Sequence, residues 1–135
     1  MGAQGTRKNR RRDLVLDAGA LIAYERGDRR VAALIKKGVL LARLIVPASV
    51  VAEVWRGGPT AARLAHIFNA SEIDPLDEGR AKEVGVRLGT RDAQNVTDAH
   101  VVCCALGHDA KVVTSDPDDM EALAKPGEPL ALIAV

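Results

Sequence analysis

The fold of this 135-residue chain is decided by the stretch Asp13-Leu14-Val15-Leu16-Asp17-Ala18-Gly19-Ala20-Leu21-Ile22-Ala23. A short apolar run ends in Asp17, and a helical pattern begins at once, with Gly19 permitting a turn between the two. A run without polar alternation is typical of a strand that is buried on both faces of a parallel sheet. We therefore expect a strand over residues 13–17 that carries Asp17 at its carboxyl end.

The same alternation of short apolar runs and helical patterns continues along the chain. Further strands are expected over residues 44–47, 72–76, 111–114 and 130–135. The first expected helix follows Asp17, the second ends near Gly38, and the third begins at Ser49 as N-cap. Helices are also expected over residues 61–68 and 116–124. Two more are expected over 77–88, ending at Gly89, and over 97–106, closed by Gly107 and His108. This order predicts an α/β fold, a three-layer sandwich with a short, mostly parallel sheet and helices on both faces. Ligands of such sheets bind at the carboxyl ends of the strands.

Length and charge divide the chain into a basic tail and one domain. Residues 1–12 carry five basic groups and no acid, and we expect them to be a disordered tail, with an RNA-binding arm as the alternative. Residues 13–135 are long enough for a single domain. That domain holds 14 Lys and Arg against 18 Asp and Glu, a net charge of −4. An acidic body that handles a polyanion needs a metal ion or local basic patches.

The cysteines and histidines indicate the compartment and argue against a zinc site. Cys103 and Cys104 are adjacent in an apolar run, which favours buried thiols in a reducing cytoplasm over a disulfide. No apolar stretch is long and pure enough to span a membrane, so we expect a soluble, cytoplasmic protein. His66, His100 and His108 are too scattered for a zinc pattern and are interpreted as surface or helix-end residues.

Four acids stand at the ends or beginnings of expected elements: Asp17, Glu53, Asp98 and Asp116. Clustered carboxylates bind Mg²⁺ or Mn²⁺ and so activate water for phosphodiester hydrolysis. Asp116 and Asp98 also have a structural interpretation, since acids at a helix start cap it or complement its dipole. Glu53 lies among apolar residues, where an unpaired carboxylate costs several kcal/mol, so a metal or an Arg partner is expected beside it.

Four segments together resemble the PIN domains, and among them the VapC toxins of bacterial toxin–antitoxin pairs. The segments are Leu14-Val15-Leu16-Asp17-Ala18-Gly19-Ala20-Leu21-Ile22-Ala23, Val50-Val51-Ala52-Glu53-Val54, Thr97-Asp98-Ala99-His100-Val101-Val102 and Val113-Thr114-Ser115-Asp116-Pro117-Asp118-Asp119. Each segment alone is weakly specific. Their order, separations and expected elements make the combined resemblance strong, and it covers residues 13–135.

The resemblance implies a PIN-like sandwich with the activity of a Mg²⁺- or Mn²⁺-dependent endoribonuclease, in which a metal-activated water attacks RNA phosphodiesters. It also implies a homodimer that a VapB-like antitoxin protein inhibits. Carried over by position, Asp17, Glu53, Asp98 and Asp116 are the acidic quartet that binds metal. Asp119 is an auxiliary metal ligand, and Thr114 is a hydroxyl that positions the substrate. Family members often have Ser or Thr where this chain has Gly19, which puts one supporting hydrogen bond in question.

Three basic residues near the expected site, Arg26, Arg56 and Arg91, are candidates for RNA contacts. Because aromatic residues are scarce, recognition would depend on phosphate contacts and RNA shape. Two other functions remain open. One is a catalytically silent PIN-like binding module. The other is a Mg²⁺-dependent phosphatase or phosphoacceptor of similar α/β architecture, in which Asp17 would form an acyl phosphate.

Overall fold

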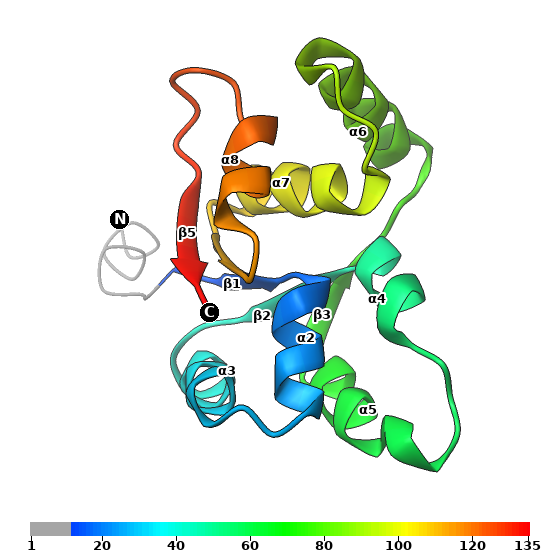
Figure 1. Cartoon of the computed structure of the whole chain (residues 1–135), viewed down its shortest axis with the longest axis vertical. Helices are drawn as coiled ribbons and strands as arrows, with labels where there is room; N and C mark the ends of the chain where they lie inside the picture. Colours follow the sequence, from blue (N-terminus) through cyan, green and yellow to red (C-terminus); the bar gives the residue numbers. More distant parts are fainter. Residues whose placement is uncertain (1–11) are drawn as a thin grey trace, which may run out of the picture.

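A five-stranded parallel sheet lies at the centre of the computed structural model, which describes residues 12–135 (Figure 1). The strands are β1 (Leu14–Leu16), β2 (Leu44–Pro47), β3 (Ser71–Asp74), β4 (Lys111–Thr114) and β5 (Ala131–Ala134). They are arranged in the order β3-β2-β1-β4-β5, and every neighbouring pair is parallel. The predicted α/β fold is therefore confirmed, with β1 as the fully buried central strand.

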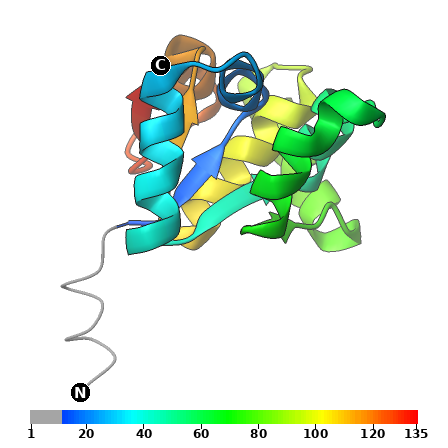
Figure 2. The same cartoon turned by 90° about the horizontal axis from the view of Figure 1, so that it is seen from below.

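Helices cover both faces of this sheet. One layer contains α2 (Ala18–Glu25), α3 (Arg29–Leu41) and α5 (Ala62–Asn69), and the other contains α6 (Glu78–Arg91), α7 (Val96–His108) and α8 (Pro117–Leu123). Viewed from below, α3 and α5 lie in front of the sheet and α7 lies behind it (Figure 2). The short α4 (Ala48–Val54) contacts α2 of one layer and α7 of the other, and a 3₁₀ turn (Pro59–Ala61) precedes α5.

The core explains why the strands lack polar alternation. Residues of β1, β2 and β4 pack against α7, in which every residue from Ala99 to Ala105 is buried. Cys103 and Cys104 belong to this stretch as free, buried thiols, as the sequence predicts. Within residues 12–135, no helix is both long and apolar enough to cross a membrane.

Two helices end later than their glycines predict. α6 continues through Gly89 to Arg91, with Asp92 as its C-cap, and α7 continues through Gly107 to His108, with Asp109 as its C-cap. Both aspartates adopt the left-handed conformation, with φ of 51°. Aspartate tolerates this conformation better than most residues, so it terminates these helices where glycine was expected to.

Helix α3 likewise continues beyond Gly38, to Leu41. Gly38 is a packing residue rather than a terminator, because a Cβ there would lie 2.7 Å from Leu44 Cδ2 and 3.0 Å from Leu14 Cδ1. The glycine thus allows α3 to approach the sheet closely. The predicted disordered tail lies outside the described residues, apart from Arg12, whose guanidinium donates to the Asp109 carboxylate at 3.0 Å.

Candidate active site

Asp17 lies where the central strand meets α2 and is 3% exposed. Its Oδ1 accepts a hydrogen bond of 2.8 Å from the Ala20 backbone N–H, which caps α2. The Thr114 hydroxyl and the Ser115 backbone N–H also lie near the carboxylate and favour its charged form. Burial raises the pKa of Asp17 above its ordinary value despite these donors, and the charge of Asp116 raises it further. The carboxylate is therefore fixed in place and sensitive to nearby charge.

Thr114 and Asp116 reach the same place from the neighbouring strand β4. Thr114 is completely buried, and its Oγ1 accepts a 2.9 Å hydrogen bond from the Asp116 backbone N–H. Asp116 stands at the N-cap position of α8, but its side chain makes no capping hydrogen bond. Asp116 thus occupies the predicted N-cap position, followed by Pro117, without stabilising the helix through a side-chain cap. Its exposed carboxylate instead lies 3.4 Å from the Ser115 hydroxyl.

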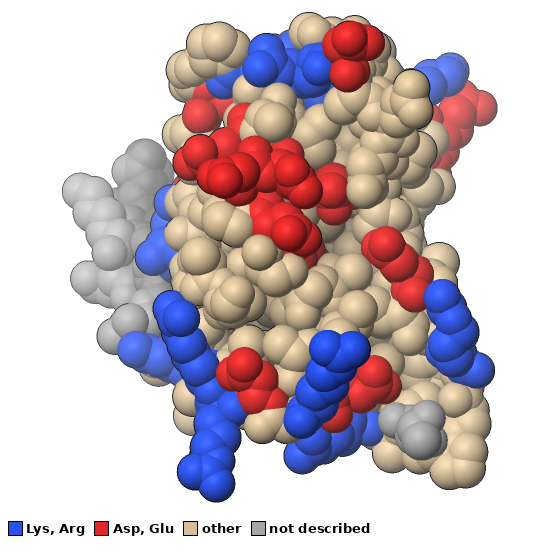
Figure 3. Space-filling model, in the orientation of Figure 1, with Lys and Arg blue, Asp and Glu red and all other residues tan. Residues whose placement is uncertain are grey.

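Asp98 shows that the acids converge. It lies in the first turn of α7, where the cap is Asn95, whose side chain accepts from the Asp98 N–H at 2.9 Å. The pKa of Asp98 is raised to about 6, first by burial and then by the negative charges of other carboxylates. These are Asp17, Asp119, Glu53 and Asp116. Figure 3 shows Asp and Glu side chains gathered over α7 and α8, with Lys and Arg toward the α3 and α5 side.

Glu53 joins this group from α4, but in a different setting from the one the sequence suggests. It is exposed, because α4 buries Val50 alone and turns Ala52 and Glu53 outward. The expectation of a carboxylate enclosed by apolar residues is therefore wrong. No Arg partner is present either, since none of the five acids forms an ion pair with Lys or Arg in the part of the chain from residue 12 onward.

The donor set of this acidic centre fits a hard divalent cation. All five side chains offer carboxylate oxygens, the ligands that Mg²⁺ and Mn²⁺ prefer, and their mutual repulsion has no internal counter-charge among the described residues. No three of them bring their oxygens within 4.8 Å of one another in the described region. A cation bound here would be held directly by one or two carboxylates and otherwise through water, as Mg²⁺ commonly is.

A second polar cluster surrounds Asp74, at the carboxyl end of β3. The ligand-type atoms of Asp74, Cys104 and His108 lie within 4.8 Å of one another. However, Arg80 donates to both oxygens of Asp74, at 3.0 and 3.1 Å, and His100 and His108 donate at 2.9 and 3.1 Å. Burial alone would raise the pKa of Asp74, but these donors hold it at about 2.

This cluster is a hydrogen-bonded network rather than a metal centre, because Arg80 already supplies its positive charge and burial raises the pKa of the Cys104 thiol. His100 is completely buried within it, so the expectation of a surface histidine is wrong. Since His100 Nε2 donates to Asp74, neutral His100 accepts at Nδ1 from the Ser49 hydroxyl at 2.7 Å. Ser49 is therefore not the predicted N-cap of α4, a position that Pro47 occupies.

The three arginines suggested for RNA do not enter the acidic centre. Arg26 is exposed at the end of α2 that lies opposite Asp17. Arg56 donates to the Ala52 and Trp55 carbonyls at the end of α4. Arg91 donates to the Ala122 carbonyl near the end of α8. All three remain peripheral candidates.

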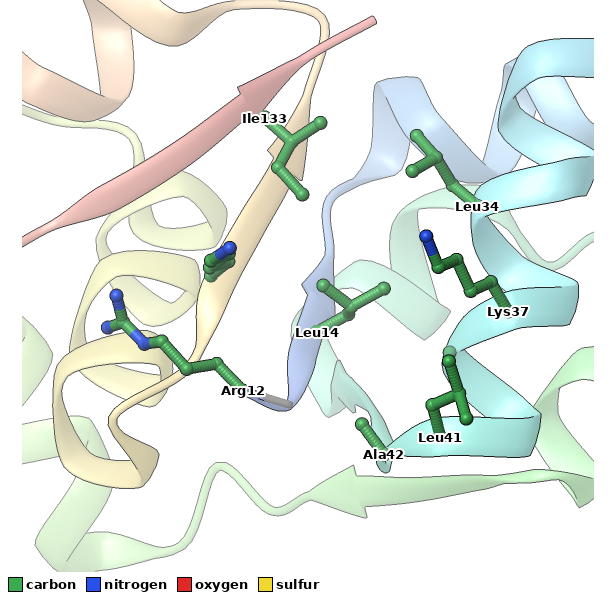
Figure 4. Close-up of a pocket in the computed structure, with 9 residues that line it drawn as sticks. Arg12, Leu14, Leu34, Lys37, Leu41, Ala42 and Ile133 are labelled. Atoms are coloured by element: carbon green, nitrogen blue, oxygen red, sulfur yellow. The ribbon is translucent and has the colours of Figure 1, made fainter. Parts of the chain in front are cut away.

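A cavity of about 290 Å³ lies apart from the acids (Figure 4). It is lined by Leu14, Lys37, Leu41 and Ile133, among others, and Arg12 and Ala42 place it near the amino ends of the strands. Asp17 and Asp116 lie beyond the carboxyl ends of β1 and β4. The cavity therefore does not belong to the acidic centre.

Comparison with known proteins identifies the family. Residues 14–126 match the PIN domain, and the chain belongs to the PIN domain family, whose members are generally nucleases. No curated protein sequence matches the chain. Among solved structures, VapBC2 from Rickettsia felis bound to a DNA fragment from its promoter has a TM-score of 0.70 at 12% identity, covering 90% of this chain and 98% of that one.

Two further structures share the fold. A toxin–antitoxin complex from Klebsiella pneumoniae has a TM-score of 0.70 at 15% identity, covering 90% of this chain and 97% of that one. FitAcB from Neisseria gonorrhoeae has a TM-score of 0.64 at 19% identity, covering 89% and 96%. At these identities the likeness establishes the fold alone.

Proposed function

We propose that this chain is a metal-dependent endoribonuclease whose active site is formed by Asp17, Glu53, Asp98 and Asp116, with Asp119 as an auxiliary ligand. The observation that carries the proposal is the electrostatic coupling of Asp98, on α7, to the four other acids, which come from the β1–α2 junction, from α4 and from the start of α8 in a PIN domain. Four uncompensated charges around the half-buried carboxylate of Asp98 are unfavourable unless a cation binds there.

Each residue of the proposed active site is assigned a separate role. Asp17 is the fixed ligand, held by the hydrogen bond from the Ala20 N–H, with the Thr114 hydroxyl nearby. Thr114 is buried, so we assign its hydroxyl to positioning Asp17 rather than to contact with RNA. Asp98 and Asp116 complete the inner group, and exposed Glu53 closes the site on the α4 side. When bound, Mg²⁺ or Mn²⁺ supplies positive charge for the phosphate and lowers the pKa of water.

We infer that RNA approaches across the exposed side of this centre. Arg26, Arg56 and Arg91 lie outside this centre and are proposed to contact phosphates rather than bases. Phosphate contacts position a nucleic acid without reading its sequence. The ribose 2′-hydroxyl is then the group that would distinguish RNA from DNA.

We also propose that the protein is a VapC-like toxin, forms a homodimer and is neutralised by a VapB-like antitoxin. The similar structures named above are toxin–antitoxin complexes, which supports this assignment. A further support is the end of α3, where Val39, Leu40 and Leu41 are 48%, 73% and 47% exposed. Consecutive apolar side chains on a surface are typical of a protein contact, and we assign this one to the second copy.

The substrate class is tested with labelled oligonucleotides. Single-stranded RNA and DNA of one sequence are incubated with the protein and Mn²⁺, and the fragments are resolved on a gel. We expect discrete RNA fragments and intact DNA. Cleavage of both would make the chain a nuclease without RNA specificity, and stable labelling of Asp17 by an acyl phosphate donor would replace the nuclease assignment with a phosphoacceptor.

A further inference from the structure

Gly19 and Ser115 meet at the acidic centre. Gly19 is the second residue of α2, two positions after Asp17, and Ser115 joins β4 to α8. A Cβ built on Gly19 would lie 2.9 Å from the Ser115 Cβ and would collide with its Oγ. The Ser115 side chain therefore occupies the space that any side chain at position 19 would need.

The hydroxyl in that space lies beside two of the acids. Its Oγ donates toward Asp116 Oδ2 at 3.4 Å, and the backbone N–H of Ser115 lies near the Asp17 carboxylate and favours the charged form of that group. The position of the absent Cβ of Gly19 is 3.5 Å from Asp17 Oδ1. Ser115 thus lies beside both acids and contacts Asp116 through its side chain.

We propose that Ser115 is a positioning residue of this site, and that its hydroxyl enters from the β4–α8 turn through the space left by Gly19 to orient the Asp116 carboxylate toward a bound cation. The proposal rests on the metal-dependent function proposed above. It accounts for Gly19, because a side chain at position 19 and the hydroxyl at position 115 exclude each other. Groups that orient metal ligands typically change metal affinity or activity by about 10- to 100-fold when removed.

Because side chains at positions 19 and 115 compete for the same space, the proposal can be tested by moving the hydroxyl from one position to the other. Ser115→Ala removes the hydroxyl, and Gly19→Ser in the wild-type background displaces it. The double variant Gly19→Ser with Ser115→Gly brings the hydroxyl back from the α2 side. Thr90→Ala is the matched control, because Thr90 is an exposed hydroxyl on α6 that donates to the Val86 carbonyl.

The readout is Mn²⁺ affinity by titration calorimetry, with RNA cleavage measured in parallel. We expect Ser115→Ala, Ser115→Gly and Gly19→Ser to bind Mn²⁺ about 10-fold more weakly, at the lower end of the range for such groups. The double variant is expected to bind more tightly than Ser115→Gly alone, and Thr90→Ala to match the wild type.

Three outcomes separate the possibilities. Wild-type affinity in Ser115→Ala would overturn the role of Ser115. A double variant no better than Ser115→Gly would also overturn it, because the loss would then not come from the hydroxyl. Wild-type protein that binds Mn²⁺ but leaves RNA intact would contradict the proposed ribonuclease, while the affinities of the variants would still decide the role of Ser115.

Discussion

Asp98 is a carboxylate held among other carboxylates, with a pKa of about 6 against an ordinary value of 3.8. Because its pKa is higher in the folded than in the unfolded state, the folded protein binds more protons between these values, and stability falls as pH rises through them. We expect Asp98→Asn to raise the free energy of unfolding of metal-free protein by about 1 kcal/mol at pH 7.5, a value reduced for solvent screening. Most of this gain should vanish by about pH 4.

The measurement is thermal unfolding in EDTA at both pH values, where the gain corresponds to roughly 3–5 °C in Tm. His100 also makes stability depend on pH, in the opposite direction, because burial lowers its pKa. Comparing Asp98→Asn with the wild type at the same pH cancels this contribution, since both proteins contain His100. Glu121→Gln, at an exposed acid of α8, serves as the control. An equal gain at both pH values would show that charge at position 98 is not its cause.

The candidate site was predictable as a set of residues but not as an arrangement. Asp17 and Asp116 follow strands, so their positions at the carboxyl edge of the sheet follow from the pattern of the sequence. The exposure of Glu53 does not follow from the sequence pattern, because a seven-residue helix at the sheet edge buries little of its surface. Ser115 could not be identified either, since its role depends on close approach to a distant glycine.

At the scale of elements, Arg87 links α6 to the segment after α8. Its guanidinium donates to both oxygens of Glu128, at 2.7 and 3.0 Å, and to the Leu123 carbonyl at 2.9 Å. The hydrogen bonds from Arg87 lower the pKa of Glu128 to about 2. We expect Arg87→Leu to lower the free energy of unfolding by about 3 kcal/mol, because a largely buried pair loses one partner. Urea unfolding measures this loss.

Lys82→Ala provides the comparison on the same helix. Lys82 pairs with Glu78 at 3.0 Å, and both side chains are exposed. Exposed pairs of this kind contribute less than about 0.5 kcal/mol. Similar losses in Arg87→Leu and Lys82→Ala would contradict the assigned role of Arg87.

Strand positions were easier to predict than helix ends. β2 and β4 begin and end where the apolar runs do, since a central parallel strand has no polar face. Helix ends depend on tertiary contacts: α3 continues through Gly38 because that glycine packs on the sheet. The Asp74 network was not predictable, because it joins residues from β3, α4, α6 and α7 that are distant in sequence.

For the whole molecule, the exposed end of α3 leads to a prediction about assembly. We expect the wild type to be a dimer by light scattering and Leu40→Glu to be a monomer that circular dichroism shows to be folded, because a charge on a buried contact opposes association. Val86→Glu is the control, since Val86 is a 65% exposed apolar residue on α6. A dimer in both variants would place the contact elsewhere, and a monomeric wild type would contradict the homodimer.

The acidic centre and its peripheral arginines predict how RNA binding responds to salt. We expect the affinity of Asp17→Asn protein for single-stranded RNA to fall as salt rises, because binding releases counterions from the phosphates. Adding Arg56→Ala should reduce the slope of log affinity against log salt by about 0.7, the value for one phosphate contact. Filter binding over a salt series measures both slopes, with Lys82→Ala as control. An unchanged slope would remove Arg56 from the RNA contacts.

The central claim, an endoribonuclease that requires the acidic centre and a divalent cation, is tested most directly on total cellular RNA. Purified wild-type protein and Asp17→Asn are compared with Mg²⁺ or Mn²⁺ and with EDTA, after circular dichroism shows both to be folded. We expect discrete fragments from the wild type with metal alone, and none with EDTA or from Asp17→Asn. Intact RNA with folded, metal-supplied wild type, or equal cleavage by Asp17→Asn, would contradict the account.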